Sequence, residues 1–274
     1  TTLSERNWET NVTILSGDLN GDDVVTGSGA TLSISGNSEN SFHVVYNADV
    51  YGICGTARLD GFTIQGGNEM SGLYGGGVYN IGSSPSLANC IITANSAPYG
   101  GGVGNTHSSS PVLNNCTISG NFSFGYGGGI SNEGSSPTLT NCMIINNNAG
   151  SEGGGIFNTG SSSLNLNNCT VSGNNCSGFG GGIFNTSSAA ILNNSIIWGN
   201  SAAVCGKQIY NDGSEFTLNY SCYGNGTNDV SGTLTLANCI TSDPKFINPN
   251  HDFRLAADSP CLDTGSDGYN TETT

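Results

Sequence analysis

The sequence predicts an all-β solenoid, and three repeating features indicate it. An apolar residue follows each copy of a recurring glycine triplet, and an asparagine lies two positions further along. A second signature, an asparagine followed by cysteine or serine, keeps the same spacing. Self-similarity at a fixed period is typical of solenoids, in which each repeat contacts its neighbours. The triplets begin at Gly75, Gly100, Gly127, Gly153 and Gly180, at spacings of 25, 27, 26 and 27 residues.

Each repeat contains only short apolar segments, such as Leu113, Cys116 and Ile118, bounded by Gly, Ser, Asn or Pro. No segment shows helical periodicity over three turns, and runs of three to five residues between turn signals indicate short strands. Three such strands account for one coil. We therefore expect a right-handed, single-stranded parallel β-helix with about 26 residues per coil, because parallel crossovers are right-handed.

Stacked coils place equivalent residues above one another, so the repeat predicts columns of identical side chains. We expect a column of small buried thiols and ladders of asparagine amides, with the corner asparagines in the left-handed conformation. The glycine triplets suit corners that have no room for a Cβ atom. The predicted ladder residues are Asn80, Asn105, Asn132, Asn158, Asn185 and Asn211, and the predicted thiol column is Cys90, Cys116, Cys142 and Cys169.

The repeat weakens at both ends, and we expect one domain over residues 1–274. Residues 1–70 contain a lead-in and one or two degenerate coils, because residues 59–64 mimic a regular strand. Residues 71–225 form the regular coils. Residues 226–274 form a short last coil, with residues 236–239 as its strand, and an irregular C-terminal segment.

The composition excludes several partners. The chain has 20 acidic and 5 basic residues and a net charge of -15, which repels phosphate backbones and anionic membranes. No apolar run approaches the roughly 20 residues that span a bilayer. We therefore expect no nucleic-acid partner and no membrane insertion. Few lysines and abundant Gly and Asn suit an extracellular or cell-surface bacterial solenoid.

Ten cysteines raise the question of disulfides. The four column cysteines are expected to remain free as small buried groups. Cys176 and Cys205 fall near the same turn of successive coils, and Cys222, Cys239 and Cys261 cluster in the C-terminal part, where one or two disulfides fit an oxidising compartment. The pairing cannot be assigned from the sequence.

The repeat Gly-Gly-Gly-Ile-x-Asn, followed by Ser-Ser-Pro-x-Leu-x-Asn-Cys-x-Ile-x-x-Asn, resembles bacterial right-handed β-helix surface proteins. These include the polymorphic outer-membrane-protein repeats and the choice-of-anchor Q proteins. The lead-in at residues 6–18 and the closing segments at 252–255 and 259–265 are similar to those of the family. The resemblance implies an exported protein with an adhesive or structural role. Members usually carry further sequence on both sides, so we expect this chain to be trimmed.

Parallel β-helices also include polysaccharide lyases and hydrolases, so catalysis was weighed against the residues present. Between residues 70 and 206, only His107, Glu133 and Glu152 belong to the Asp, Glu, Lys, Arg and His set. Glycoside hydrolysis needs two carboxylates about 5 to 10 Å apart, and the two glutamates occupy different positions in their coils. We expect no catalytic residues on the regular coils, and His107 is interpreted as a solvated loop residue.

Two further groups are candidate binding sites. Asp18, Asn20 and Asp22 have the alternating oxygen ligands that begin a calcium loop, although Gly29 stands where an EF-hand places its glutamate. Calcium is the only cofactor considered, and an acidic turn is the alternative. Four aromatic residues precede glycine triplets and form a file that could bind carbohydrate or only stabilise the solenoid. They are Tyr74, Tyr99, Tyr126 and Phe179, beside a second file of Tyr79, Phe157, Phe184 and Tyr210.

The sequence thus favours a non-enzymatic, extracellular structural or adhesive module. Uncapped solenoid ends expose unpaired backbone groups, and neither terminus has the pattern of an amphipathic capping helix. End-to-end self-association into a filament is therefore one expectation. The alternatives are carbohydrate binding along the aromatic file, with a polysaccharide or host-surface ligand, and a polysaccharide lyase or hydrolase that uses the acidic ends.

Overall fold

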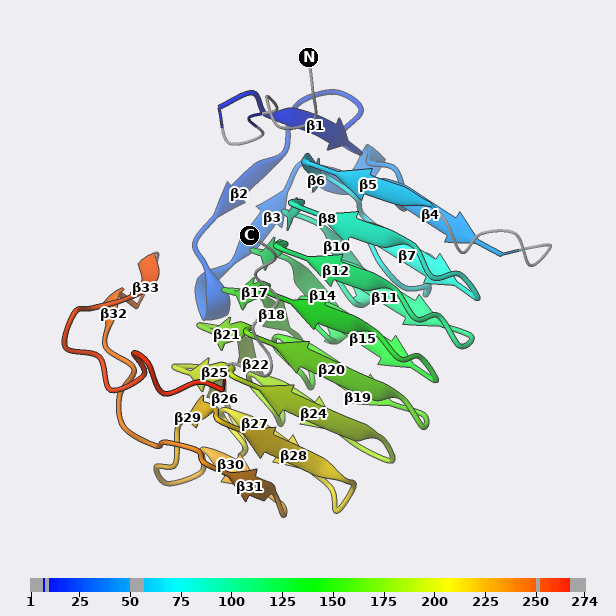
Figure 1. Ribbon diagram of the computed structural model, residues 1–274. Coiled ribbons are helices and arrows are strands. Elements are labelled where there is room, and N and C mark those ends of the chain that lie inside the picture. Colours follow the sequence, from blue (N-terminus) through cyan, green and yellow to red (C-terminus); the bar gives the residue numbers. More distant parts are fainter. Residues whose placement is uncertain (1–6, 8–9, 50–56, 250–251, 267–274) are drawn as a thin grey trace.

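The computed structural model describes residues 7, 10–49, 57–249 and 252–266, and the chain winds through them as a parallel β-solenoid (Figure 1). The lead-in expected at residues 6–18 lies partly outside the described residues. Strands of successive coils pair in parallel and in register, for example Val103 with Val78 on one side and Ile130 on the other. The predicted solenoid with its repeat of about 26 residues is confirmed.

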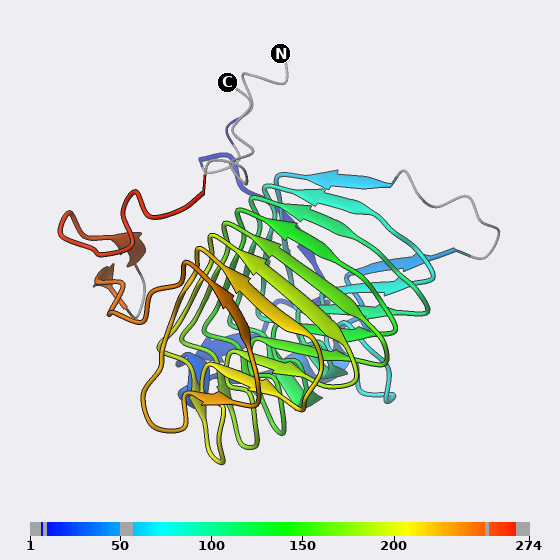
Figure 2. The same ribbon diagram turned by 60° about the horizontal axis from the view of Figure 1, so that its bottom comes forward.

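Each regular coil contributes four strands, one to each of four parallel sheets (Figures 1 and 2). The first sheet contains β4 (Val45–Ala48), β7 (Val78–Ile81), β11 (Val103–Thr106), β15 (Ile130–Glu133), β19 (Ile156–Thr159), β23 (Ile183–Asn185), β27 (Ile209–Asn211) and β30 (Val230–Ser231). The second sheet contains β5 (Arg58–Asp60), β8 (Ser86–Ala88), β12 (Val112–Asn114), β16 (Thr138–Thr140), β20 (Ser163–Asn167), β24 (Ala189–Asn193), β28 (Phe216–Asn219) and β31 (Thr235–Ala237).

The third sheet contains β1 (Thr13–Ser16), β6 (Phe62–Gln65), β9 (Ile91–Thr93), β13 (Thr117–Ser119), β17 (Met143–Ile145), β21 (Thr170–Ser172), β25 (Ile196–Trp198) and β29 (Cys222–Tyr223). The fourth contains β10 (Ser96–Tyr99), β14 (Phe122–Tyr126), β18 (Asn148–Ala149), β22 (Asn175–Cys176) and β26 (Ser201–Ala202). The expectation of three strands per coil missed this fourth sheet. Its strands are short and polar, and two of the five have only two residues in β18 and β22 and carry no alternating apolar pattern.

The N-terminal part differs from the expectation of degenerate coils over residues 30–70. An antiparallel hairpin of β2 (Val24–Thr26) and β3 (Ser33–Ser35), with the 3-10 turns η2 (Gly29–Thr31) and η3 (Asn37–Glu39), lies along the side of the shaft. The N–H of Gly29 donates to the carbonyl of Asn146 at 3.2 Å, so the hairpin tip reaches coils far from β1. Coil winding resumes only at β4, because the antiparallel pair satisfies the backbone of residues 24–35 by itself.

The C-terminal part agrees with the expected abbreviated coil. Strand β31 covers the predicted final strand, and Cys222 forms an isolated parallel bridge with Ile240. The chain then leaves the coil, forms an antiparallel hairpin of β32 (Phe246–Asn248) and β33 (Asp252–Leu255), and runs beside the shaft. In Figure 1 this segment lies to the side of the last coils and does not cover their end.

Three aliphatic columns fill the interior, one from each of the first three sheets. Their side chains are at most 1% exposed, and burying each contributes about 1.5 to 3 kcal/mol. The register places like residues directly above one another, which is why the spacing of the repeat is nearly constant. The columns include Val78, Val103, Ile130, Ile156 and Ile183, then Leu87, Leu113, Leu139, Leu166 and Leu192, then Ile64, Ile92, Ile118, Ile144 and Val171.

The glycine triplets close the corner between the fourth and first sheets. Gly100 has a φ of +64°, which favours glycine, and a Cβ atom on Gly101 would lie 2.2 Å from the carbonyl oxygen of Phe122. The predicted reason for the triplets, a lack of room for Cβ atoms, is confirmed and a left-handed backbone is added to it.

Two asparagine ladders run along the interior. In the first, each Nδ2 group donates to the Oδ1 of the next coil, at 2.8 Å from Asn80 to Asn105 and at 2.9 Å from Asn105 to Asn132. Asn47 begins this ladder and Asn211 ends it. The predicted ladder Asn80, Asn105, Asn132, Asn158, Asn185 and Asn211 is therefore confirmed.

The backbone conformation assigned to these corner asparagines was wrong. They lie on strands of the first sheet with their side chains inward, and the left-handed asparagines are those of the other signature, Asn89, Asn115, Asn141, Asn168 and Asn194, at φ of 49° to 54°. The reason is that a strand residue needs no left-handed turn, whereas the corner before the thiol column does.

The second ladder is formed by Asn95, Asn121, Asn147, Asn174 and Asn200 and ends on Gln208. The Oδ1 of Asn174 accepts both the backbone N–H and the Nδ2 of Asn147, each at 3.0 Å. Its own Nδ2 donates to the carbonyl of Ile144 at 2.8 Å and to the Oδ1 of Asn200 at 3.0 Å. Each amide of this ladder is thus saturated without water.

Candidate functional sites

The predicted aromatic file forms one stacked row together with part of the second file. Tyr74, Tyr99 and Tyr126 stack at 4.8 and 5.6 Å between ring centroids, and Tyr126 continues onto Phe157 at 4.7 Å. The row then follows Phe184 and Tyr210. The crossover occurs because Gly104 and Ser131 leave the second file without rings in two coils.

Phe179 does not stack on Tyr126, because Glu152 occupies the equivalent position in the intervening coil. It contacts Tyr210 instead, with the ring planes tilted by 47°. In the row, the interplanar angles run from 30° at Tyr74 and Tyr99 to 3° at Phe184 and Tyr210, so the ring faces cover one another. Sugar stacking needs a free ring face, and this geometry favours the structural alternative for the row.

Glu133 and His107 lie together in a shallow hollow of about 210 Å³ that Thr106 also lines. The hydroxyl of Tyr74 donates a short hydrogen bond to the carboxylate of Glu133, two coils away. Burial first, and then this hydrogen bond and the charge of Glu133, raise the pKa of Tyr74. The hollow holds one carboxylate, and Glu152 is not among its lining residues.

The sequence analysis missed the meeting of His107 and Glu133. Their separation of 26 residues is one repeat, which could have revealed that the two side chains occupy the same position in successive coils. His107 adopts a left-handed conformation, with a φ of +55°, and its Nδ1 lies 3.0 Å from the Oγ1 of Thr106.

The acidic turn before the N-terminal hairpin gathers three carboxylates. Ligand atoms of Asp18, Asp22 and Asp23 all lie within 4.8 Å of one another. The predicted ligand Asn20 is not part of this group, and its Oδ1 instead accepts the backbone N–H of Asp22 at 3.2 Å. Asp23, which the sequence analysis did not select, takes its place because the Asx turn directs Asn20 into the loop backbone.

The carboxylate of Asp18 accepts backbone N–H groups of Gly21 and Asp23 at 2.6 and 3.3 Å. Burial alone would raise the pKa of Asp18, but these hydrogen bonds outweigh it and lower the pKa. Burial raises the pKa of Asp23, a hydrogen bond from Asn40 opposes this, and the charges of Asp18 and Asp22 add to the rise. Hard oxygen ligands of this kind fit calcium, which stays a prediction for this turn.

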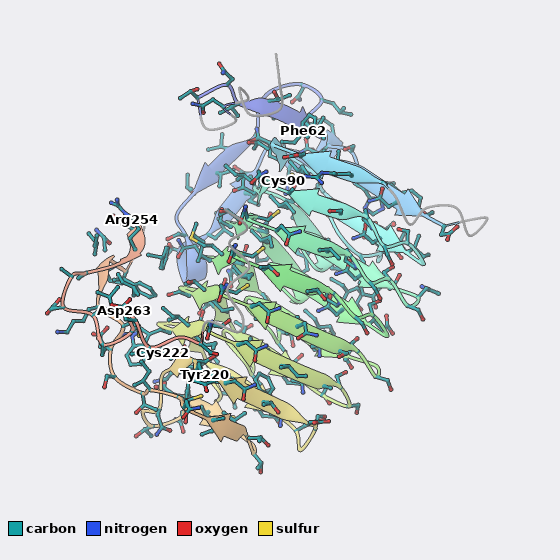
Figure 3. All side chains as sticks on the ribbon, in the orientation of Figure 1. Phe62, Cys90, Tyr220, Cys222, Arg254 and Asp263 are labelled. Carbon is teal, nitrogen blue, oxygen red and sulfur yellow. The ribbon has the colours of Figure 1, made fainter. Side chains whose placement is uncertain are left out.

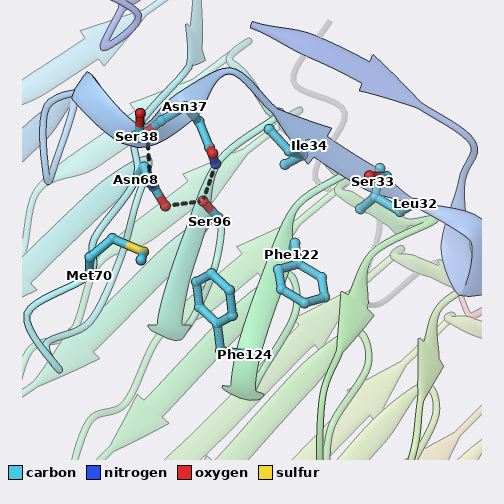
Figure 4. A pocket seen from close by; sticks show the side chains of 10 residues that line it. All are labelled: Leu32, Ser33, Ile34, Asn37, Ser38, Asn68, Met70, Ser96, Phe122 and Phe124. Atoms are coloured by element: carbon cyan, nitrogen blue, oxygen red, sulfur yellow. Dashed lines mark hydrogen bonds between the residues drawn. The ribbon is translucent and has the colours of Figure 1, made fainter.

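A pocket of about 290 Å³ lies between the N-terminal hairpin and the fourth sheet (Figure 4). Phe122 and Phe124 of β14 form one wall, with ring centroids 5.0 Å apart and planes at 87°. Opposite them, Ser96 donates to Asn68 at 2.6 Å and accepts from Asn37 at 3.2 Å. The lining has no charged side chain, and Phe124 is 51% exposed.

Sequence reasoning did not find this pocket. Phe122 and Phe124 lie in the fourth sheet, which the sequence analysis missed, and the hairpin wall was expected to be a coil. The signal present in the sequence was an Phe-Ser-Phe segment at a strand position that is polar or small in the other coils.

The nine cysteines among the described residues are free thiols, and Cys54 lies outside those residues. The column thiols are 1% exposed, as expected, and each donates to carbonyls such as that of Leu87, 3.6 Å from Cys116. Cys176 pairs with Ala202 and Cys205 with Phe179, so these two predicted neighbours are not opposite each other. The thiols of Cys222 and Cys261 are hydrogen-bonded to each other.

Four parallel sheets, inward ladders of identical side chains and left-handed corners define a parallel β-solenoid. Residues 24–197 match the family model of the right-handed β-helix region, so this chain belongs to the right-handed β-helix family. No curated protein and no solved structure matches the chain. Across the described residues, no helix has the length and apolar character that a membrane crossing requires.

Proposed function

We propose that this chain is a non-enzymatic structural module, a stiff rod belonging to an exported or surface-displayed bacterial protein. The observation that supports this most is the first asparagine ladder, which runs from Asn47 to Asn211 without a break. Every coil is tied to the next through its interior as well as through four sheets. Such a shaft resists bending and presents its turns to solvent, as a spacer or an adhesive scaffold requires.

The composition supports a place outside the cell or on its surface. Only 9% of the residues are charged, and the interior depends on amide ladders, glycine corners and small thiols. The resemblance to exported bacterial β-helix proteins, given by the glycine and asparagine signatures, points the same way. Detection of the protein by antibody on intact cells or in culture medium tests this placement, and exclusively cytosolic protein would contradict it.

The non-enzymatic part of the proposal is tested by incubation with a broad panel of neutral and acidic polysaccharides, with and without calcium. We expect no release of reducing ends or unsaturated products, because the hollow of Glu133 and His107 offers a single carboxylate. Product release that is lost in Glu133→Gln would establish the alternative, a polysaccharide hydrolase or lyase.

End-to-end association is the form of self-assembly that the geometry favours. Both ends of the shaft present strands of the same sheets, with β1, β4 and β5 at one end and β29, β30 and β31 at the other (Figures 1 and 2). At the second end, a hollow of about 190 Å³ is lined by Tyr223, Val230, Leu234 and Leu236 among others. Unpaired edges of parallel sheets over an apolar surface can accept strands of a second copy.

Charge opposes this association. Nine acidic residues lie before residue 70 and nine after residue 206, so the two ends repel one another at low ionic strength. We expect electron microscopy and sedimentation to show monomers at low salt and longer particles at high salt. Leu236→Asp should block the growth, whereas Ile247→Asp, an exposed residue of β32 away from the end, should not. Monomers at every salt concentration would contradict the stacking.

A second candidate function is binding of a neutral carbohydrate in the pocket of Figure 4. The observation that favours it is the uncharged lining, in which the half-exposed ring of Phe124 faces amide and hydroxyl groups. Phe124→Ala should reduce retention on a neutral polysaccharide matrix, and Tyr99→Ala, whose ring faces are covered, should not. Equal retention of Phe124→Ala and the unaltered protein would remove this candidate.

A further inference from the structure

The C-terminal segment returns to the shaft after the β32–β33 hairpin. The Nδ2 of Asn194 donates to the carbonyl of Ser266 at 3.0 Å, and the N–H of Ser266 donates to the Oδ1 of Asn194 at 2.9 Å. Asn194 lies at the corner before β25, so the segment is held against the outside of the third sheet. Figure 3 shows Asp263 of this segment close to Tyr220 and Cys222 of the last coils.

Two thiols meet where this segment touches the shaft. Cys222, in β29, is 2% exposed, whereas Cys261, in the returning segment, is partly exposed. Both line the same cavity of about 140 Å³, together with Ser195, Tyr220 and Ile240 among others. Their thiol groups are hydrogen-bonded to each other, and the Cys222 thiol also lies 3.3 Å from the carbonyl of Ser242.

We propose that Cys222 and Cys261 form a redox-responsive latch, in which a disulfide between them fastens the returning C-terminal segment to the last coils of the solenoid. Contact between two thiols on separate segments satisfies the first requirement for a disulfide, because bonding needs only a small approach of the sulfur atoms. The segment is otherwise attached at this point by the two hydrogen bonds of Asn194.

The two thiols have different roles in the oxidation. The hydrogen bond from Cys222 outweighs burial and lowers the pKa of Cys261, whereas the same contact, followed by burial, raises the pKa of Cys222. Cys261 is therefore the thiolate that reacts first, and it is the one that solvent reaches.

The oxidant is a small-molecule disulfide such as oxidised glutathione. The Cys261 thiolate attacks one of its sulfurs, forming a mixed disulfide and releasing a first glutathione thiolate, which takes up a proton. Cys222 then gives its proton to solvent and attacks the Cys261 sulfur, which expels a second glutathione thiolate. Two protein thiols are oxidised to one disulfide, and one glutathione disulfide is reduced to two thiols.

The other cysteine groups lack this combination. The column thiols Cys90, Cys116 and Cys142 also contact one another, but each is 1% exposed, and their pKa values are raised. Cys239 turns toward the column, where its thiol lies 3.3 Å from the carbonyl of Leu218. An oxidant in solution therefore meets a reactive thiol with a waiting partner at Cys261.

Equilibration of the intact protein with reduced and oxidised glutathione tests the latch. Titration of the denatured, alkylation-quenched protein should show a fall from ten thiols to eight, and peptide mapping should identify one disulfide between Cys222 and Cys261. Trypsin can cut after Lys245 and Arg254, which lie between the two cysteines, so the C-terminal fragment should remain attached on a non-reducing gel and leave on a reducing one.

Cys261→Ser should keep nine thiols under the same oxidant and lose its fragment on both gels, whereas Cys205→Ser, the control, should fall from nine thiols to seven. Ten thiols in the fully oxidised buffer would overturn the proposal. A map that places the disulfide between Cys222 and Cys239, or within the column, would also overturn it, and this result does not depend on whether any variant folds.

Discussion

Asn174 and Asn175 are adjacent in the sequence but face opposite sides of the wall, which allows the inner ladder to be tested by one substitution at two positions. Asn174 is 1% exposed and belongs to the second ladder. Asn175 is partly exposed, and its Nδ2 donates to the Oδ1 of Asn148 on the outer surface at 2.9 Å. Both residues begin as asparagine and both become alanine, so the intrinsic effect of the change is matched.

Asn174→Ala removes the acceptor of two N–H groups of Asn147, one from the backbone and one from the side chain. It also takes a donor from the carbonyl of Ile144. Since a buried N–H without a partner costs about 1 to 3 kcal/mol, the two orphaned groups predict a loss of about 2 to 6 kcal/mol in the free energy of unfolding. Asn175→Ala should cost about 0.5 kcal/mol or less, because water replaces the lost amide.

Urea unfolding followed by far-ultraviolet circular dichroism measures both values. The reasoning fails if Asn174→Ala loses less than about 1 kcal/mol, the value of an ordinary hydrogen bond, or no more than Asn175→Ala does. An Asn174→Ala protein that accumulates only as aggregates, beside a folded Asn175→Ala protein, agrees with the larger cost.

Three further predictions concern backbone, charge and metal. Gly101→Ala should abolish folding, since its Cβ would lie 2.2 Å from a carbonyl oxygen, whereas Gly134→Ala, also at an exposed corner with a positive φ but with 3.5 Å of room, should cost about 1 to 2 kcal/mol in thermal unfolding. Burial would raise the pKa of Asp212, but hydrogen bonds from two hydroxyls and a backbone N–H outweigh it and lower the pKa below 3.8, so this carboxylate stabilises the fold above pH 3.8 and loses its effect as the pH falls through its folded-state pKa. Asp212→Asn should therefore destabilise the protein at pH 7 and be nearly neutral at pH 2, and an equal effect at both values would contradict this reasoning. Calcium should raise the melting temperature reversibly against chelator, and Asp23→Asn should abolish the rise while Glu215→Gln keeps it; a calcium response that survives in Asp23→Asn would exclude the acidic turn as its site.

The architecture could be predicted because the repeat makes it visible many times over. A register that places Val78, Val103 and Ile130 in one column is encoded in the spacing of the triplets. Thus the first ladder, the thiol column and the glycine corners all followed from residue types at a fixed period. The backbone conformation of the asparagines did not, since period alone does not distinguish an inward strand position from a left-handed corner.

The candidate sites were harder to predict because they form where the repeat is interrupted. The pocket beside Phe124 needs a hairpin whose own strands are non-repetitive, and the replacement of Asn20 by Asp23 at the acidic turn depends on one Asx hydrogen bond. His107 and Glu133 are an exception, because their separation of one period was available in the sequence.

The sequence by itself determined the winding of this protein, since stacking in register forces every repeat to place like atoms upon like atoms, and only some residues tolerate that. Tertiary structure alone decided which segments leave the winding and return to it. The hairpin that reaches Asn146 and the tail that brings Cys261 to Cys222 are contacts between segments far apart in the chain. No period links such segments, so their meeting depends on the surface that the finished coils present.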